Sequence, residues 1–308
     1  MIYLKSFSFP DESQEGSVLD DVMSKWHNTI YPFKIASGVL LETLEFAPVT
    51  ILYGSNGSGK TTLLNVIAQR LGVERATPYN TSTFFPDYIS LCSYEEKGDG
   101  VPQASRIITS DDVFDFVLNK RIVNSGIDSR REQLITEYLK LKQQDNGRFR
   151  YHGTEDLEKL EKIVAMRNNT LSMYVKKNVG LNIREKSNGE SAIRYFFDNI
   201  TENALYLLDE PENSLAPLRQ QELVTFLEEA VRFYNCQFII ASHSPFVLAM
   251  REAKIYDLDT RPVEVKKWQE LEGIRVYYDF FRRHADKFEE RGWLQPEAPC
   301  DLTPEFIF

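Results

Sequence analysis

Residues 53–62 read YGSNGSGKTT and follow the apolar run APVTIL of residues 47–52. Residues 54–61, GSNGSGKT, match the phosphate-loop pattern G-x-x-x-x-G-K-[ST]. Glycines in such a loop let the backbone wrap closely around a phosphate and turn amide hydrogens toward it. The residues expected to bind a nucleotide are therefore Gly54, Ser55, Asn56, Gly57, Ser58, Gly59, Lys60, Thr61 and Thr62.

Two side chains of this loop have specific expected roles. Lys60 should reach the β- and γ-phosphates, and the hydroxyl of Thr61 should bind Mg²⁺. The following segment, TLLNVIAQRL (62–71), has the pattern of an amphipathic helix, whose N-terminus favours an anion. Together these features predict a site for a nucleoside triphosphate with magnesium.

Strand-like apolar runs occur at 49–53, 204–208 and 237–241. The last two alternate hardly at all, which is typical of strands that are covered on both faces of a sheet. Between them lies a segment of helical length, residues 213–235. Strand, helix and strand in this order indicate a parallel βαβ unit, so we predict an α/β fold with a largely parallel sheet flanked by helices.

Polar residues follow two of these strands. Asp209 and Glu210 come directly after the run at 204–208, where Asp209 could hold Mg²⁺ through water and Glu210 could polarise an attacking water. His243 follows the next strand and could reach a γ-phosphate. An acidic pair or a histidine at a strand end is often only solvent-exposed or structural, but the phosphate loop favours the catalytic interpretation of all three.

A further polar segment, KSNGES, occupies residues 186–191. Taken alone it is a polar turn before the helical pattern SAIRYFFDNI, with Ser187 as the helix cap. Its position between the phosphate loop and the acidic pair gives it a second interpretation.

The order of these motifs resembles that of the ATP-binding-cassette ATPases. In that comparison SNGES is similar to the signature motif L-S-G-G-Q, with Lys186 in place of Leu and Asn188 in place of the first Gly. The resemblance covers about residues 46–70 and 185–260. It implies ATP and Mg²⁺ as ligands, a cassette-type ATPase head as the fold, and four more nucleotide-binding residues, Ser187, Asn188, Gly189 and Glu190.

The residues of two motifs favour one branch of these ATPases. Transporter subunits usually read D-E-P-T-S-A-L-D and T-H-D, whereas this chain reads DEPENSLAP and SHSP. It is more similar to stand-alone ATPases related to RecF, to structural-maintenance-of-chromosomes heads and to the overcoming-lysogenization nucleases. Such heads bind two nucleotides between two copies, so the resemblance implies an ATP-dependent homodimer in which Ser187 and Gly189 contact the partner's γ-phosphate.

Other parts of the chain carry weaker signals. We expect one ATPase domain over residues 1–308. Within it, residues at about 111–180 should form a compact helical insertion that is too short for a long coiled-coil arm. The tail after residue 268 should contain a helix that packs against the domain. Gln103 and Ser110 are alternative candidates for the glutamine loop of the family. Tyr31 and Phe33 could stack on adenine, although both also fit core packing.

Composition narrows the class of protein. The chain has 308 residues, with no secretory signal and no apolar stretch long enough for a transmembrane helix, so we expect a cytoplasmic protein without membrane insertion. Three widely spaced cysteines fit reduced thiols. The net charge of −10 does not indicate nucleic-acid binding, although residues 121–150 are locally basic and leave a nucleic-acid or protein partner possible.

Three functions are compatible with these features. The first is an ATP-hydrolysing switch that dimerises on ATP and acts on a partner, in DNA repair, phage defence or control of an effector. The second is the ATPase subunit of a membrane transporter. The third is the ATPase component of a nuclease complex, for which the tail offers no metal-binding motif.

Overall fold

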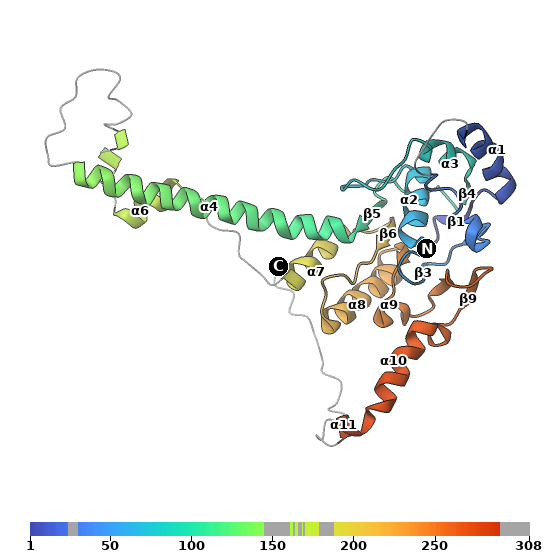
Figure 1. The fold of residues 1–308 in the computed structure, drawn as a ribbon. Coiled ribbons are helices and arrows are strands. Elements are labelled where there is room, and N and C mark those ends of the chain that lie inside the picture. Colours follow the sequence, from blue (N-terminus) through green and yellow to red (C-terminus); the bar gives the residue numbers. More distant parts are fainter. Residues whose placement is uncertain are drawn as a thin grey trace.

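The computed structural model describes most of the 308 residues. The described residues are 1–23, 30–144, 161–162, 164–165, 168, 170–178 and 188–289. Within them, α-helices surround a mixed but mostly parallel sheet, and one long helix extends away from it (Figure 1). The predicted α/β class with a largely parallel sheet is therefore confirmed.

The main sheet has six strands among the described residues. In spatial order they are β5 (Arg106–Thr109), β6 (Leu205–Asp209), β7 (Gln237–Ala241), β3 (Val49–Tyr53), β8 (Lys254–Asp257) and β9 (Glu264–Lys266). The first five run parallel, and β9 runs antiparallel to β8. All three apolar runs are strands, and β6, α8 (Pro217–Phe233) and β7 form the predicted parallel βαβ unit.

Alternate residues of the central strands enter two separate cores. Leu52 of β3 and Leu207 of β6 belong to one apolar cluster, while Ile51 and Leu208 belong to the other. This division follows from the two-residue period of a strand, which sends successive side chains to opposite faces. Both faces are covered, which explains why these strands are apolar almost without alternation.

Different elements cover the two faces. On one side lie α1 (Glu12–Met23), α2 (Lys60–Leu71), α3 (Phe85–Leu91), the turn η1 (Ser37–Val39) and a small antiparallel sheet made of β2 (Thr43–Glu45), β1 (Leu4–Ser8) and β4 (Ser93–Glu96). On the other lie α7 (Asn188–Asn199), α8 and α9 (Pro245–Leu248). The buried side chain of Gln237 accepts hydrogen bonds from the backbone N–H groups of Tyr3 and Leu4, at 2.7 and 2.9 Å, and so joins the small sheet to β7.

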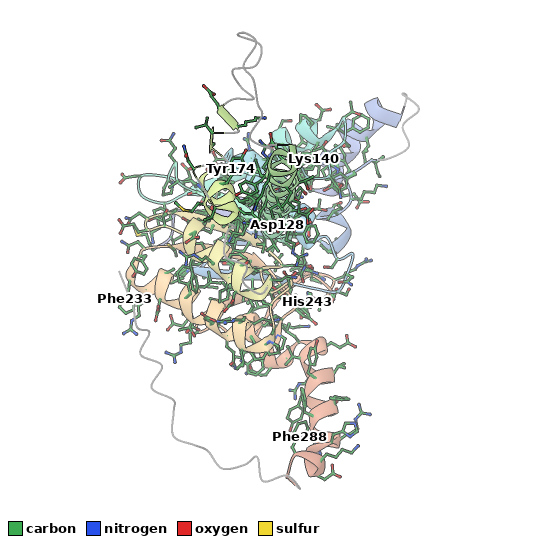
Figure 2. The ribbon with its side chains drawn as sticks, turned by 90° about the vertical axis from the view of Figure 1, so that its left-hand side faces the viewer. Asp128, Lys140, Tyr174, Phe233, His243 and Phe288 are labelled. Atoms are coloured by element: carbon green, nitrogen blue, oxygen red, sulfur yellow. The ribbon has the colours of Figure 1, made fainter. Side chains whose placement is uncertain are left out.

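The insertion is helical where it is described, but it is not compact. Its first helix, α4 (Ser110–Gln144), is 35 residues long and projects from the sheet as an arm (Figure 1). The shorter α6 (Leu171–Asn178) packs against it, and the ring centroids of Tyr138 and Tyr174 lie 5.4 Å apart; Figure 2 looks along the arm and labels Lys140 of α4 and Tyr174 of α6. Leu134 and Tyr174 belong to a small core between these helices that is separate from the two cores of the sheet. The described part of the insertion is therefore an extended helical pair, whereas a compact insertion was expected, and residues 145–160 of the insertion lie outside the described residues.

The tail helix also differs from expectation. After the turn η3 (Trp268–Glu270), α10 (Glu272–Arg283) buries Ile274, but its aromatic residues, including Tyr277, Phe280 and Phe281, are exposed. With α11 (Ala285–Glu289) it projects from the sheet, and Phe288 lies near its far end (Figure 2). The described part of the tail therefore packs at its start and not along its length. None of the helices that the structure describes is long and apolar enough to cross a membrane.

Candidate nucleotide site

The predicted phosphate loop joins β3 to α2. Gly57 and Gly59 have φ angles of +85° and +96°, a region that residues with a side chain rarely adopt. A Cβ atom on Gly59 would lie 2.6 Å from Ile35 Cγ2, and one on Gly54 would lie 2.4 Å from Ser58 Oγ. The tight course of the loop therefore depends on glycine at these positions.

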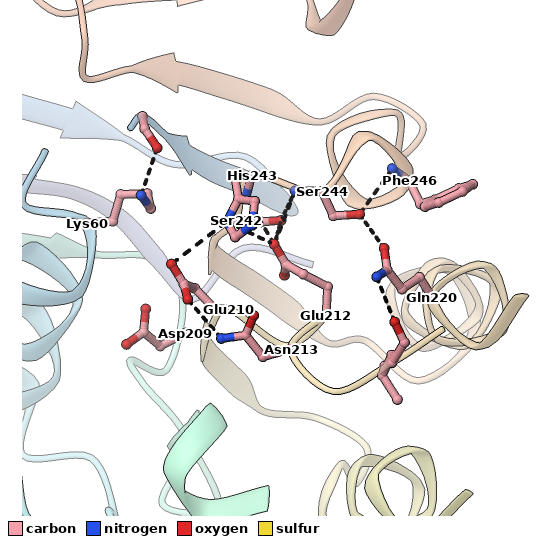
Figure 3. A network of polar contacts seen from close by, with 12 residues as sticks. Lys60, Asp209, Glu210, Glu212, Asn213, Gln220, Ser242, His243, Ser244 and Phe246 are labelled. Carbon is pink, nitrogen blue, oxygen red and sulfur yellow. Dashed lines mark hydrogen bonds and ion pairs between the residues drawn. The ribbon is translucent and has the colours of Figure 1, made fainter. Parts of the chain in front are cut away.

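Lys60, the first residue of α2, turns its side chain back into the loop. It is buried, and its Nζ donates hydrogen bonds to the carbonyl oxygens of Gly54 at 2.7 Å and Ser55 at 3.1 Å (Figure 3). A buried ammonium needs such partners because its desolvation is otherwise costly. The lysine charge is thus held at the centre of the loop.

Asp259, in the segment after β8, supports the loop from outside and carries no sequence motif. Its carboxylate accepts hydrogen bonds from the backbone N–H of Ser55 at 2.8 Å and from the Ser55 hydroxyl, also at 2.8 Å. The two residues are 204 positions apart, so nothing in the local sequence could have identified the contact.

Thr61 and Asp209 meet at the end of β6. The Thr61 hydroxyl donates to Asp209 Oδ1 at 3.0 Å, and Asp209 is buried. Burial raises the pKa of Asp209 to about 6, the hydrogen bond from Thr61 opposes this rise, and the nearby charge of Glu210 adds to it. A carboxylate that is costly to keep ionised without a cation fits a Mg²⁺ site, and a hydroxyl and a carboxylate oxygen are ligands that Mg²⁺ prefers.

This pair would be only part of a magnesium site. Among the described residues there is no group of three or more His, Cys, Asp and Glu side chains that could hold a metal ion. Mg²⁺ commonly binds through one or two protein ligands, with phosphate oxygens and water completing the shell. Thr61 and Asp209 therefore fit a magnesium ion that arrives with a nucleotide.

Glu210 follows Asp209 in an uncommon backbone conformation. Its φ is +48°, and its N–H donates to the carbonyl of Ala241 at 2.9 Å. Non-glycine residues seldom adopt this conformation, and those that do are often found at functional sites. One carboxylate oxygen, Oε2, accepts a hydrogen bond from Asn213 Nδ2 at 2.8 Å (Figure 3). Asn213 was not identified from the sequence, although it lies only three residues after Glu210.

His243 lies at the same edge of the sheet, two residues after the end of β7. Its Nδ1 is 3.8 Å from Glu210 Oε1 and 3.7 Å from Glu212 Oε1. About half of the histidine side chain is exposed. The structure thus brings Lys60, Thr61, Asp209, Glu210 and His243 to the carboxyl ends of adjacent parallel strands, where ligands of α/β proteins commonly bind.

The expected signature residues contact other elements. Ser187 lies outside the described residues, and α7 begins at Asn188. Asn188 Oδ1 accepts a hydrogen bond from Arg121 of α4, and Glu190 lies 3.6 Å from Arg219 of α8. A Cβ atom on Gly189 would have its nearest neighbour, the Ser214 carbonyl oxygen, at 3.8 Å, so packing within the chain does not require glycine there.

The remaining candidates lie in different environments. Gln103 is in an exposed turn before β5, whereas Ser110 begins α4 next to Thr109, which pairs with Asp209 in the sheet. Phe33 is buried edge-on against Tyr88, as core packing predicts. Tyr31 is partly buried, stacks on Phe85 and places its hydroxyl 3.3 Å from Thr62 Oγ1.

One family of known sequences matches half of the chain. Its model covers residues 96–249 and is described as "AAA domain, putative AbiEii toxin, Type IV TA system". The chain belongs to this AAA-domain family. The matched region contains Asp209, Glu210 and His243, while the phosphate loop precedes it. This family confirms the predicted resemblance to ATPases at the level of an AAA domain.

Two solved structures show a distant likeness to this AAA domain. One is the Smc head domain of Pyrococcus furiosus with an extended coiled coil, bound to the C-terminal domain of ScpA. The two sequences are 14% identical, the match covers 77% of this chain and 94% of that chain, and the TM-score is 0.38. Another is a dimeric post-hydrolysis state of an ATP-binding cassette bound to ADP and Pi, with 11% identity, coverage of 75% and 90%, and a TM-score of 0.37. No curated protein matches the sequence. Likenesses this weak carry no argument about the function of the AAA domain.

Proposed function

We propose that this AAA domain binds ATP with Mg²⁺ and hydrolyses it to ADP and phosphate. The observation that carries the proposal is the convergence of five side chains at one edge of the sheet, with the Lys60 ammonium inside the loop and the Thr61–Asp209 pair beside it. Each of these groups can meet one part of a triphosphate and its metal ion. An unrelated glycine turn would not need a buried lysine and a buried aspartate.

The roles follow from the chemistry of the groups. Lys60 would exchange its carbonyl partners for β- and γ-phosphate oxygens, and the amides of residues 54–62 would surround the β-phosphate. Thr61 and Asp209 would hold the Mg²⁺, which when bound neutralises charge on the phosphates. Glu210, kept in orientation by Asn213, would accept a hydrogen bond from the attacking water, and His243 would contact the γ-phosphate.

We further propose that residues 1–308 form one ATPase unit that dimerises on ATP and switches a partner. The N-terminus of α7, with Asn188, Gly189 and Glu190, would contact the nucleotide of the second copy together with Ser187, since the amides of a helix N-terminus favour an anion. Arg121 of α4 donates a hydrogen bond to Asn188, so closure of the dimer at Asn188 would change the position of the arm. The toxin system named in the description of the family supports a protein effector as the partner.

Replacement of Lys60 tests the ATP site. Lys60→Ala removes the one side-chain cation placed inside the loop, so we expect ATP affinity to fall by at least a factor of ten and hydrolysis to be lost. Binding can be followed with a fluorescent ATP analogue and hydrolysis by phosphate release. Lys267→Ala, at a position after β9, is a matched control with unchanged activity. A folded Lys60→Ala protein that binds and hydrolyses ATP normally would refute the assignment of the loop.

A further inference from the structure

Glu212, two residues after Glu210, is a buried carboxylate that the proposed reaction does not use. Only 4% of the residue is exposed. Burial of a carboxylate is costly unless hydrogen bonds compensate for the lost water. The position of the compensating donors therefore indicates what this residue does.

Three consecutive residues after β7 supply those donors. Glu212 Oε1 accepts hydrogen bonds from Ser242 Oγ at 2.6 Å, from His243 N at 3.0 Å and from Ser244 N at 3.1 Å (Figure 3). A single carboxylate oxygen thus fixes the backbone on both sides of the His243 Cα atom. The turn is also held from the other side, since Ser244 Oγ donates to Gln220 Oε1 of α8 at 2.7 Å.

The imidazole has little other support. The His243 side chain is about half exposed, and Nδ1 lies 3.7 Å from Glu212 Oε1 and 3.8 Å from Glu210 Oε1. The ring therefore faces the gap between the two carboxylates, and the turn that carries it sets its position. Removal of the carboxylate of Glu212 would take away the acceptor of the Ser242 hydroxyl and of the His243 and Ser244 amides, of which only the Ser244 amide has a second acceptor among the described contacts, Ser242 Oγ at 3.1 Å.

We propose that Glu212 is the positioning residue of His243. It acts through the hydrogen bonds to residues 242–244, which hold the imidazole beside Glu210, and it does not itself touch the nucleotide. This inference rests on the proposed ATPase function where it concerns catalysis, but the positioning of the ring can be tested without any turnover.

The kinetic test is a double-mutant cycle. Glu212→Ala should lower kcat at least tenfold and change the Kd for ATP less than threefold. In a His243→Ala background the same substitution should lower kcat less than twofold, because the residue through which it acts is gone. The proposal would be overturned if the loss of kcat in the double variant equals the product of the losses in the two single variants, or if Glu212→Ala has a normal kcat.

Glu212→Gln is the conservative partner of this variant. Its amide oxygen can still accept at the position of Oε1, so kcat should recover at least threefold relative to Glu212→Ala. This variant also serves in the cycle if Glu212→Ala does not fold, with the same expectation of non-additivity. If Glu212→Ala and Glu212→Gln both fold and lose the same factor in kcat, the effect does not come from the hydrogen bonds at Oε1.

The structural test uses the imidazole resonance of His243. The chain has four histidines, so His243 can be assigned from the signal that disappears in His243→Ala. In nucleotide-free protein this resonance should move in Glu212→Ala and stay in place in Glu229→Ala, a control at an exposed position of α8. An unmoved resonance would overturn the proposal. Absence of ATP hydrolysis by the unsubstituted protein, with a moved resonance, would reject the ATPase function and retain the positioning of the ring.

Discussion

Asp209 should make the stability of the metal-free protein depend on pH. Burial raises its pKa in the folded state to about 6, above the ordinary value of 3.8, so the folded protein holds the proton more tightly than the unfolded chain does. This contribution to stability is fully present below about pH 4 and is lost as the pH rises through 6. The change is about 3 kcal/mol, because one pKa unit corresponds to about 1.4 kcal/mol.

The comparison with Asp209→Asn isolates this effect. Between pH 4 and pH 8 in EDTA, the free energy of unfolding of the variant should rise by about 2.4 kcal/mol relative to the unsubstituted protein, since the amide does not titrate and most of the change falls within this range. Urea unfolding at several pH values measures the difference, in which the other titrating groups largely cancel. Two pH profiles that run parallel would contradict the burial of an ionisable group at this position.

Residues with a local signal could be predicted, and residues joined through space could not. The phosphate loop and the acidic pair are contiguous motifs, so their spacing is visible in the sequence. Asp259 meets Ser55 only because β8 and β3 are neighbours in the sheet. Glu212 lies two residues after the acidic pair, but its donors come from the turn after β7, 30 to 32 residues later.

At the scale of elements, the strands buried on both faces of the sheet could be predicted from the sequence, and the extended arm could not. The strands at 49–53 and 237–241 were located from their apolar composition, which reflects a sheet covered on both faces. The arm could not be located in the same way, because an extended helical pair and a compact insertion have similar charged, helical patterns. In the structure α4 contacts α6 and α7, and these contacts are not apparent in the sequence of α4 alone.

Leu134 tests whether the small core holds the arm. It is buried between α4 and α6, so Leu134→Ala should destabilise this pair by on the order of 2 kcal/mol, as cavity-forming substitutions do. Backbone amides of α6 and the outer half of α4 should then exchange hydrogen about 30 times faster, while those of β6 and β7 keep their rates. Leu139→Ala, at an exposed position of α4, is the control. Unchanged exchange in the arm would mean that the cluster does not stabilise it.

At the scale of the whole molecule, the arm and the tail helix α10 are both directed away from the sheet, and the arm has contacts near the proposed site. The arm begins at Ser110, directly after the strand that pairs with Asp209, and contacts Asn188 at the start of α7. If the proposed function is correct, a structural change at the nucleotide site would reach the arm through its first turn, and a change at the proposed signature would reach it through Arg121. ATP-dependent pairing of two copies is the part of the proposal that can be tested most directly.

The most direct test of the central claim is the mass of Glu210→Gln in solution with and without Mg-ATP. The amide keeps the shape of the side chain but loses the charge that would polarise water, so ATP should bind and remain. Size-exclusion chromatography with light scattering should give one chain mass without nucleotide and twice that mass at saturating Mg-ATP, while Lys60→Ala stays at one chain mass in both conditions. A folded Glu210→Gln protein that binds ATP and remains a monomer would contradict the proposed ATP-dependent dimer.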